Sequence, residues 1–214
     1  MVTEIRVYIE GGGDSKDTKA FLRQGFNAFL KDLISAARSR RIRWNIVMCG
    51  GRDAAFDAFR TALQQHSDAF NVLLVDSEVP VVTTPWHHLQ ERDGWGDDRV
   101  SDDHCQLMTQ TMEAWFIADV EALSTFYGPE FRRGCIPRNP DVEQIAKADL
   151  EASLRSASRD TLKGEYHKIR HASGLLKIID ASTVRRASRH CDRLFTILAA
   201  KMEQSPLATP FHYR

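Results

Sequence analysis

Three short apolar segments early in the chain predict β-strands. Residues 5–10 read I-R-V-Y-I-E, with β-branched side chains at alternating positions, and residues 43–49 form a second strand-like segment. Residues 70–75 read F-N-V-L-L-V, a continuous apolar run typical of a strand that is buried on both faces. Glycines at 11–13 and 50–51 end the first two segments, so each strand is predicted to stop at a sharp turn.

Helical patterns lie between these strands. Asp14 or Ser15 can cap a first helix, whose apolar positions include Phe21, Phe26, Phe29, Leu30 and Leu33. Residues 53–65 predict a second helix with an apolar face formed by Phe56, Phe59 and Leu63. This alternation of strands and helices predicts an α/β fold, in which a mostly parallel central sheet is flanked by helices on both faces.

The pattern becomes less regular after residue 78. Residues 79–103 predict a long insertion that contains a short helix at about 87–92, and residues 105–109 predict a fourth strand. Residues 112–119 and 120–126 are helical by pattern.

The last third of the chain is predicted to be helical. Residues 129–140 predict a linker, and from residue 142 onward the expected core positions are Leu175, Leu176, Ile178, Ile179, Leu194, Ile197 and Leu198. We therefore expect an α/β core over residues 1–128 and a helical C-terminal region over residues 129–214, packed on the core as one compact unit.

Composition places the chain among globular proteins. It has 214 residues, of which 43% are hydrophobic and 27% charged. No apolar run approaches the roughly 20 residues that span a bilayer, and residues 1–10 lack the basic and apolar regions of a secretory signal. We therefore expect a cytoplasmic protein with no membrane partner. The four cysteines form no C-x-x-C pair, which favours reduced and mostly buried thiols.

Charge is unevenly distributed along the chain although the net charge is zero. Residues 1–128 contain 13 Lys and Arg against 19 Asp and Glu, and residues 129–214 contain 16 against 10. The neutral total argues against a protein that coats nucleic acid generally. The asymmetry permits an acidic metal centre beside a basic surface that holds phosphate.

Two acidic clusters are expected to meet at one edge of the sheet. Glu10 ends the first strand and Asp14 follows it, while Asp76 and Glu78 follow the continuous apolar strand. Ligands of parallel sheets bind outside the carboxyl ends of the strands. Ionised carboxylates that converge repel one another unless a cation neutralises them, and oxygen ligands suit Mg²⁺ or Mn²⁺.

Other ligands fit the sequence less well. The glycine turn continues as Asp14-Ser15-Lys16, so it has neither the G-K-[ST] ending of a P-loop nor the third glycine of a dinucleotide site. His167 and His171 have the spacing of a zinc pair, but no third ligand is evident. Trp86, Trp95 and Trp115 are interpreted as packing residues rather than as platforms that stack on bases.

The order and spacing of these segments resemble the TOPRIM domain. The motifs are I-E-G-G-G-D at residues 9–14 and V-L-L-V-D-S-E at residues 72–78. The acidic residue four positions after Glu10 is similar to the overcoming-lysogenization-defect (OLD) type of nuclease. The segments M-E-A-W-F-I-A-D at 112–119 and K-G-E-Y-H-K at 163–168 resemble an uncharacterised TOPRIM-like family found beside ATPases in phage-defence operons.

This resemblance implies a Rossmann-like TOPRIM fold and roles for five acidic residues. Glu10 would act as general acid or base or as a ligand, and Asp76 and Glu78 would bind a first ion. Asp14 and Glu113 could complete a site for a second Mg²⁺ or Mn²⁺. Glu78 departs from the commoner Asp-x-Asp pattern, which leaves the ligand geometry open. No tyrosine is placed as a topoisomerase nucleophile and there is no primase zinc ribbon, so strand passage and priming are not expected.

The leading functional hypothesis is a metal-dependent nuclease that hydrolyses phosphodiester bonds in DNA or RNA. The resemblance further implies antiviral defence by abortive infection, with a separate ATPase subunit as partner. Two alternatives stay open: a regulatory or interaction subunit with little or no catalysis, and a nucleotide-handling enzyme of the same fold. Clustered carboxylates favour the nuclease over a scaffold.

The basic part of the chain supplies candidate phosphate ligands. Residues 155–193 contain ten Lys and Arg against four Asp and Glu. A polyanionic substrate requires positive charge beside an acidic metal site, and such contacts make binding dependent on salt. We expect Lys163 and Lys168 to have this role, because both lie in the K-G-E-Y-H-K segment.

Overall fold

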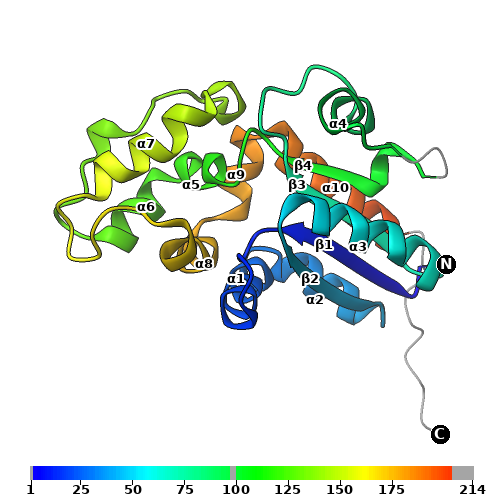
Figure 1. Ribbon diagram of the computed structural model, residues 1–214. Helices are drawn as coiled ribbons and strands as arrows, with labels where there is room; N and C mark the ends of the chain where they lie inside the picture. The colour runs from blue at the N-terminus through cyan, green and yellow to red at the C-terminus, as the bar shows by residue number, and fades with distance from the viewer. Residues whose placement is uncertain (1, 97–99, 204–214) are drawn as a thin grey trace, which may run out of the picture.

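The computed structural model describes residues 2–96 and 100–203 as an α/β protein built on one four-stranded sheet (Figure 1). The strands are β1 (Glu4–Glu10), β2 (Arg43–Gly50), β3 (Phe70–Asp76) and β4 (Cys105–Met108), in the order β2-β1-β3-β4. Each neighbouring pair is parallel. The predicted fold class and the four predicted strands are confirmed. Residues 97–99 of the predicted insertion and 204–214 of the predicted helical region lie outside the described residues.

Helices connect the strands as predicted, with one difference. The first predicted helix is two helices, α1 (Lys16–Phe29) and α2 (Lys31–Ser39), separated at Leu30. Ser15 rather than Asp14 caps α1, because the Ser15 hydroxyl accepts a hydrogen bond from the Thr18 amide at 3.1 Å. The later connections contain α3 (Arg52–Gln65) and α4 (Pro85–Asp93).

Within the described part of the chain, six further helices follow the sheet. They are α5 (Glu113–Ala118), α6 (Val120–Tyr127), α7 (Lys147–Ser158), α8 (Lys168–Ile178), α9 (Ala181–Ala187) and α10 (Arg189–Glu203). Three short 3-10 turns stand between them and before β4, at Asp102–His104, Arg133–Cys135 and Val142–Gln144. None of the described helices combines the length and the apolar character needed to cross a membrane.

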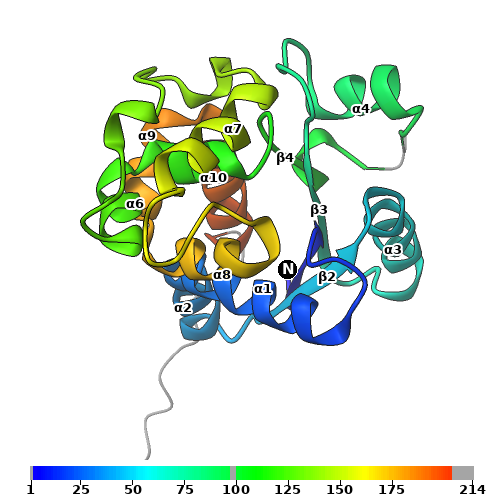
Figure 2. The same ribbon diagram turned by 60° about the vertical axis from the view of Figure 1, so that its left-hand side comes forward.

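Alternate side chains of β3 enter two different hydrophobic cores. Val72 and Leu74 pack with residues of α1, α2 and α10 on one face of the sheet. Leu73 and Val75 pack with residues of α3 and α4 on the other face. Figure 2 shows α1 and α2 on one side of the sheet and α3 on the other. Every residue of β3 is buried, which explains its continuous apolar run.

The C-terminal helices pack against elements of the sheet layer. Helix α8 lies along α1, and α10 contacts both α2 and β4 (Figure 2). Trp115 of α5 is fully buried and stacks on Phe29 of α1 with ring centroids 5.0 Å apart. These contacts hold α5 and α8 over the carboxyl ends of the strands, where the candidate site lies.

Some expected core positions are wrong. Ile178 is 42% exposed and Ile197 is only half-buried, although Leu175, Leu176 and the remaining expected positions of α8 and α10 are buried. Phe21 is 38% exposed, because its ring lies at the outer border between α1 and α8 under the Lys177 ammonium. Helical periodicity marks an apolar face but does not show how far a neighbouring helix covers it.

Candidate metal centre

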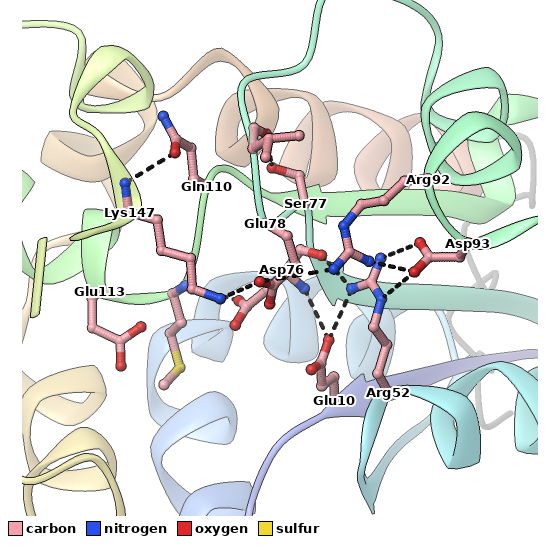
Figure 3. Close-up of polar contacts among 12 residues, drawn as sticks. Glu10, Arg52, Asp76, Ser77, Glu78, Arg92, Asp93, Gln110, Glu113 and Lys147 are labelled. Atoms are coloured by element: carbon pink, nitrogen blue, oxygen red, sulfur yellow. Dashed lines mark hydrogen bonds and ion pairs between the residues drawn. The ribbon is translucent and has the colours of Figure 1, made fainter.

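Glu10, Asp76 and Glu78 converge at the carboxyl edge of the sheet (Figure 3). Glu10 is the last residue of β1 and Asp76 the last of β3, and these two strands are parallel neighbours. One carboxylate oxygen from each of the three residues lies within 4.8 Å of the others. The structure therefore brings together the three acidic residues that the strand ends predicted.

Asp76 is the most enclosed of the three carboxylates. Its side chain is 6% exposed, Oδ1 accepts a hydrogen bond from the Met112 amide at 2.9 Å, and Oδ2 lies 3.4 Å from the Lys168 ammonium. Burial raises the pKa of Asp76 to about 7; Lys168 opposes this shift, while nearby Glu113 adds to it. Further positive charge in the cleft, such as a bound cation, would therefore favour the ionised form of Asp76 at neutral pH.

Glu10 is held by a positioned arginine. Its Oε2 accepts hydrogen bonds from the Asp76 amide at 3.3 Å and from Arg52 Nη1 at 3.2 Å. Burial raises the pKa of Glu10, and the Arg52 charge acts against that shift. Arg52 is itself fixed by a two-point contact to Asp93, at 3.1 and 2.6 Å, and lies 4.9 Å from the ring centroid of Trp95.

The backbone of Glu78 has a left-handed conformation, with φ of 71°. That conformation is uncommon outside glycine, and it is held by a hydrogen bond from the Glu78 amide to the Gln110 carbonyl at 2.8 Å. The Glu78 carboxylate pairs with the Lys147 ammonium, and Arg92 Nη2 is 3.9 Å away. Figure 3 shows Lys147 and Arg92 approaching Glu78 from opposite sides.

Glu113 and Lys168 form the wall opposite the strand ends. Glu113, the first residue of α5, is 3% exposed, and its Oε1 accepts a hydrogen bond from the Tyr166 hydroxyl at 2.8 Å. Lys168, the first residue of α8, places its ammonium 3.5 Å from the same oxygen. Burial alone would lower the pKa of Lys168, but Asp76, Glu113 and Glu10 raise it further than burial lowers it, so Lys168 stays charged.

The same residues enclose a cleft of about 210 Å³, lined by Glu10, Asp76, Glu78, Thr111, Glu113, Lys147, Glu151 and Lys168. Strand ends form one side, and the first turns of α5, α7 and α8 form the other. A larger groove of about 530 Å³ lies between α5 and residues 136–140, but no acidic side chain lines it. The smaller cleft therefore has the chemistry expected of a metal centre.

A divalent cation fits the donor set of this cleft. All three converging ligands are carboxylates, and hard cations such as Mg²⁺ and Mn²⁺ prefer oxygen. Bonds of about 2.1 Å place ligand oxygens no more than about 4.2 Å apart, which is close to the 4.8 Å within which these three oxygens lie. The group Glu10, Asp76 and Glu78 could hold a metal ion.

The other predicted site residues lie in different surroundings. Glu113 lines the cleft, whereas Asp14 is exposed in the glycine turn and is not part of the converging group. Lys168 lines the cleft, whereas the Lys163 ammonium lies 5.0 Å from the ring centroid of Phe126. The roles of Asp14 and Lys163 stay predictions.

The remaining candidates have structural surroundings. His171 is buried against the Tyr127 hydroxyl at 3.2 Å while His167 is exposed, and within residues 2–96 and 100–203 the two histidines share no cluster of metal-binding side chains. Trp115 and Trp95 are buried packing residues, and Trp86 packs against Phe59. All four cysteines are free; Cys105 and Cys191 are buried, Cys49 is half-buried and Cys135 is exposed.

Sequence reasoning missed three residues of the centre: Arg52, Lys147 and Tyr166. Arg52 could have been found, because it follows the glycines at the carboxyl end of β2, the same edge as Glu10. Tyr166 stands inside the K-G-E-Y-H-K segment that was already singled out. Lys147 has no local signal, since only the packing of α7 over the cleft brings it to Glu78.

The sequence matches a protein family over most of its length. Residues 9–199 match the family described as a domain of unknown function, DUF4276. No curated protein and no solved structure matches the chain. The matched span contains all three converging carboxylates and both lysines of the cleft. Because the match covers most of its length, the chain belongs to the DUF4276 family.

Proposed function

We propose that this protein is a Mg²⁺- or Mn²⁺-dependent nuclease of the TOPRIM kind. The observation that carries the proposal is the convergence of Glu10, Asp76 and Glu78 within 4.8 Å at adjacent strand ends. A charged lysine, Lys168, lies in the same cleft. Carboxylates that bind a cation beside a lysine that binds phosphate are the parts that hydrolysis of a phosphodiester requires.

Each residue has a role that follows from its position. Glu10, Asp76 and Glu78 would hold the ion, which would polarise the phosphate and lower the pKa of the attacking water. Glu10, whose pKa is raised by burial, is also the expected general acid or base. Lys168 donates to a phosphate oxygen, and Arg52 keeps Glu10 in place. Glu113 is available to a second ion, with Asp14 as a further expected ligand.

The wider role rests on the resemblance of the sequence segments to TOPRIM-like proteins of phage-defence operons. We propose that the substrate is DNA or RNA and that cleavage serves abortive infection. Control of the activity is assigned to a separate ATPase encoded beside the protein.

A second function is favoured by a different observation. Each carboxylate already has a basic partner in the chain: Arg52 for Glu10, Lys168 for Asp76 and Lys147 for Glu78. A cluster balanced in this way could serve a regulatory subunit that binds no metal. The nuclease should show metal-dependent cleavage of nucleic acid, whereas the regulatory subunit should not.

The nuclease is tested by incubating the purified protein with plasmid DNA, single-stranded DNA and tRNA, in Mg²⁺ or Mn²⁺, alone and with any ATPase that the same operon encodes. We expect the protein to cleave at least one of these substrates, and we expect EDTA to abolish that cleavage. Asp76→Asn should reduce the rate at least about 100-fold, while Asp57→Asn, an exposed position on α3, should leave it unchanged. Absence of cleavage under every condition, or equal cleavage by Asp76→Asn, would contradict the proposal.

A further inference from the structure

Lys147 enters the acidic cleft from α7, whereas Lys168 enters it from α8. Lys147 is the first residue of α7, its side chain is 48% exposed, and its ammonium pairs with Glu78 Oε2. We propose that Lys147 is a second phosphate-binding residue, held on Glu78 in the metal-free protein and released toward the substrate when a divalent cation binds Glu78. This inference rests on the proposed function and adds to it a residue that the sequence did not indicate.

Lys147 and a bound cation would compete for the same carboxylate, that of Glu78. The Lys147 ammonium contacts the carboxylate that, with Glu10 and Asp76, would bind the cation. A divalent ion and an ammonium that share a carboxylate repel each other strongly at contact distance. Metal binding therefore removes the interaction that holds the Lys147 side chain on Glu78.

The backbone of Lys147 is fixed independently of that ion pair. Its amide donates a hydrogen bond to Gln110 Oε1 at 3.0 Å, and the Gln110 carbonyl accepts from the Glu78 amide at 2.8 Å. Gln110 Nε2 in turn donates to the Glu143 carbonyl at 3.3 Å. The start of α7 thus stays beside the cleft when the side chain leaves, and about half of that side chain already faces solvent.

The negative charge of the cleft explains why a second lysine is needed to bind a phosphate there. Five carboxylates line it, from Glu10, Asp76, Glu78, Glu113 and Glu151, against the ammonium groups of Lys147 and Lys168. Glu151 pairs with Arg155, which lies on the same helix one turn further along. A phosphodiester that enters this cleft meets lysines on both α7 and α8, and these would hold its backbone at two points.

The test compares Lys147→Met with the wild type and with Lys31→Met. Lys31 is a matched control, because it is exposed and is the first residue of α2, as Lys147 is of α7. Two quantities are measured: the Mn²⁺ affinity of the full chain by calorimetry, and the affinity for a fluorescent 20-nucleotide DNA strand in Ca²⁺ at several salt concentrations. Thermal unfolding confirms that each variant is folded.

We expect Lys147→Met to bind Mn²⁺ about 3- to 10-fold more tightly, because a competing positive charge is gone. The same variant should bind DNA about 5- to 10-fold more weakly, with a salt slope smaller by about 1. Lys147→Arg should restore DNA binding, and Lys31→Met should match the wild type. Unchanged DNA affinity in Lys147→Met, or weaker Mn²⁺ binding, would show a purely structural ion pair.

The outcome for Lys147 can be separated from the outcome for the nuclease. A wild type that binds Mn²⁺ and DNA without cleaving contradicts the proposed function, while the comparison with Lys147→Met still decides the inference. A wild type that binds neither contradicts both. A wild type that binds and cleaves, together with a Lys147→Met variant that binds both ligands like the parent, overturns the inference alone.

Discussion

Asp76 is the residue at which folding and function conflict most directly. It is buried, it accepts a hydrogen bond from the Met112 amide, and burial raises its pKa to about 7. A buried acidic group with a raised pKa in a cleft is a common mark of a functional site. In the metal-free protein, its ionised form is held at a cost to stability.

The pH dependence of the stability of the metal-free protein shows whether the ionised Asp76 carboxylate destabilises the fold. An unfolded aspartate titrates near pH 3.9, below the folded pKa of about 7, so the folded state binds the proton more tightly. The Asp76 contribution to the free energy of unfolding therefore decreases as pH rises from about 4 to 7. Asparagine keeps an acceptor for the Met112 amide without the charge.

We expect Asp76→Asn, in EDTA, to be more stable than the wild type by roughly 1–2 kcal/mol at pH 8, and the difference to disappear near pH 4. Urea unfolding at the two pH values measures it, with Asp57→Asn as the control. A variant that is less stable than the wild type at pH 8 would mean that the Lys168 contact outweighs the cost of burial.

At the scale of elements, the strand ends were predictable and the helices that cover them were not. The glycine turns mark the ends of β1 and β2 because only glycine fits there: Gly50 has φ of 87°, and a Cβ on it would lie 2.8 Å from the Gly13 carbonyl oxygen. Parallel pairing then places Glu10 beside Asp76. Local sequence was sufficient for this part of the site.

The positions of Lys147 and Ile178 depend on long-range packing. Lys147 reaches Glu78 only because α7 returns over the sheet edge, and residues 78 and 147 are far apart in sequence. Ile178 was expected in the core from its place on an apolar helix face, but 42% of the residue is exposed. Periodicity shows which face of a helix is apolar and leaves its neighbour undetermined.

Glu143 joins the helical region to the elements beside the site. Its buried carboxylate accepts hydrogen bonds from the Ser188 hydroxyl at 2.7 Å and from the His190 amide at 2.8 Å, and pairs with the His190 ring at 2.8 Å. Its own carbonyl accepts from Gln110. Burial would raise the pKa of Glu143, but the contacts with His190 and Ser188 together lower it.

We expect Glu143→Gln to lower the free energy of unfolding by on the order of 3 kcal/mol at pH 7, because a buried pair is broken. A lowered pKa means that the stabilisation is present above the ordinary glutamate pKa of about 4.3 and is lost as pH falls below it. Denaturant unfolding measured from pH 7 down to about pH 2 should therefore show a constant gap in stability between wild type and variant above about pH 4.3, and a narrowing gap below it. A gap that stays constant down to about pH 2 would exclude the ionised pair as its source.

At the scale of the whole molecule, the acidic and basic parts of the sequence meet at one cleft. The strand ends supply Glu10, Asp76 and Glu78, and the later helices supply Lys147 and Lys168. Both lysines that line the cleft thus come from the basic part of the chain, residues 129–214.

Nucleic-acid binding should depend more on the lysines that line the cleft than on lysines outside it. We expect Lys168→Ala to weaken DNA binding in Ca²⁺ by about tenfold and to reduce the salt slope by about 1. Lys163→Ala should have a smaller effect, since its ammonium lies over Phe126. Fluorescence anisotropy at several salt concentrations measures both. A larger loss from Lys163→Ala would move the phosphate-binding surface away from the cleft.

Calorimetric titration of Mn²⁺ into EDTA-stripped protein tests the central claim most directly. If Glu10, Asp76 and Glu78 bind a divalent cation, the wild type and Asp57→Asn should bind Mn²⁺ with a Kd below about 1 mM. Single changes of Glu10 to Gln, Asp76 to Asn and Glu78 to Gln should each weaken binding at least about tenfold. A wild type without measurable binding, or three variants that bind Mn²⁺ as tightly as the wild type, would contradict the claim.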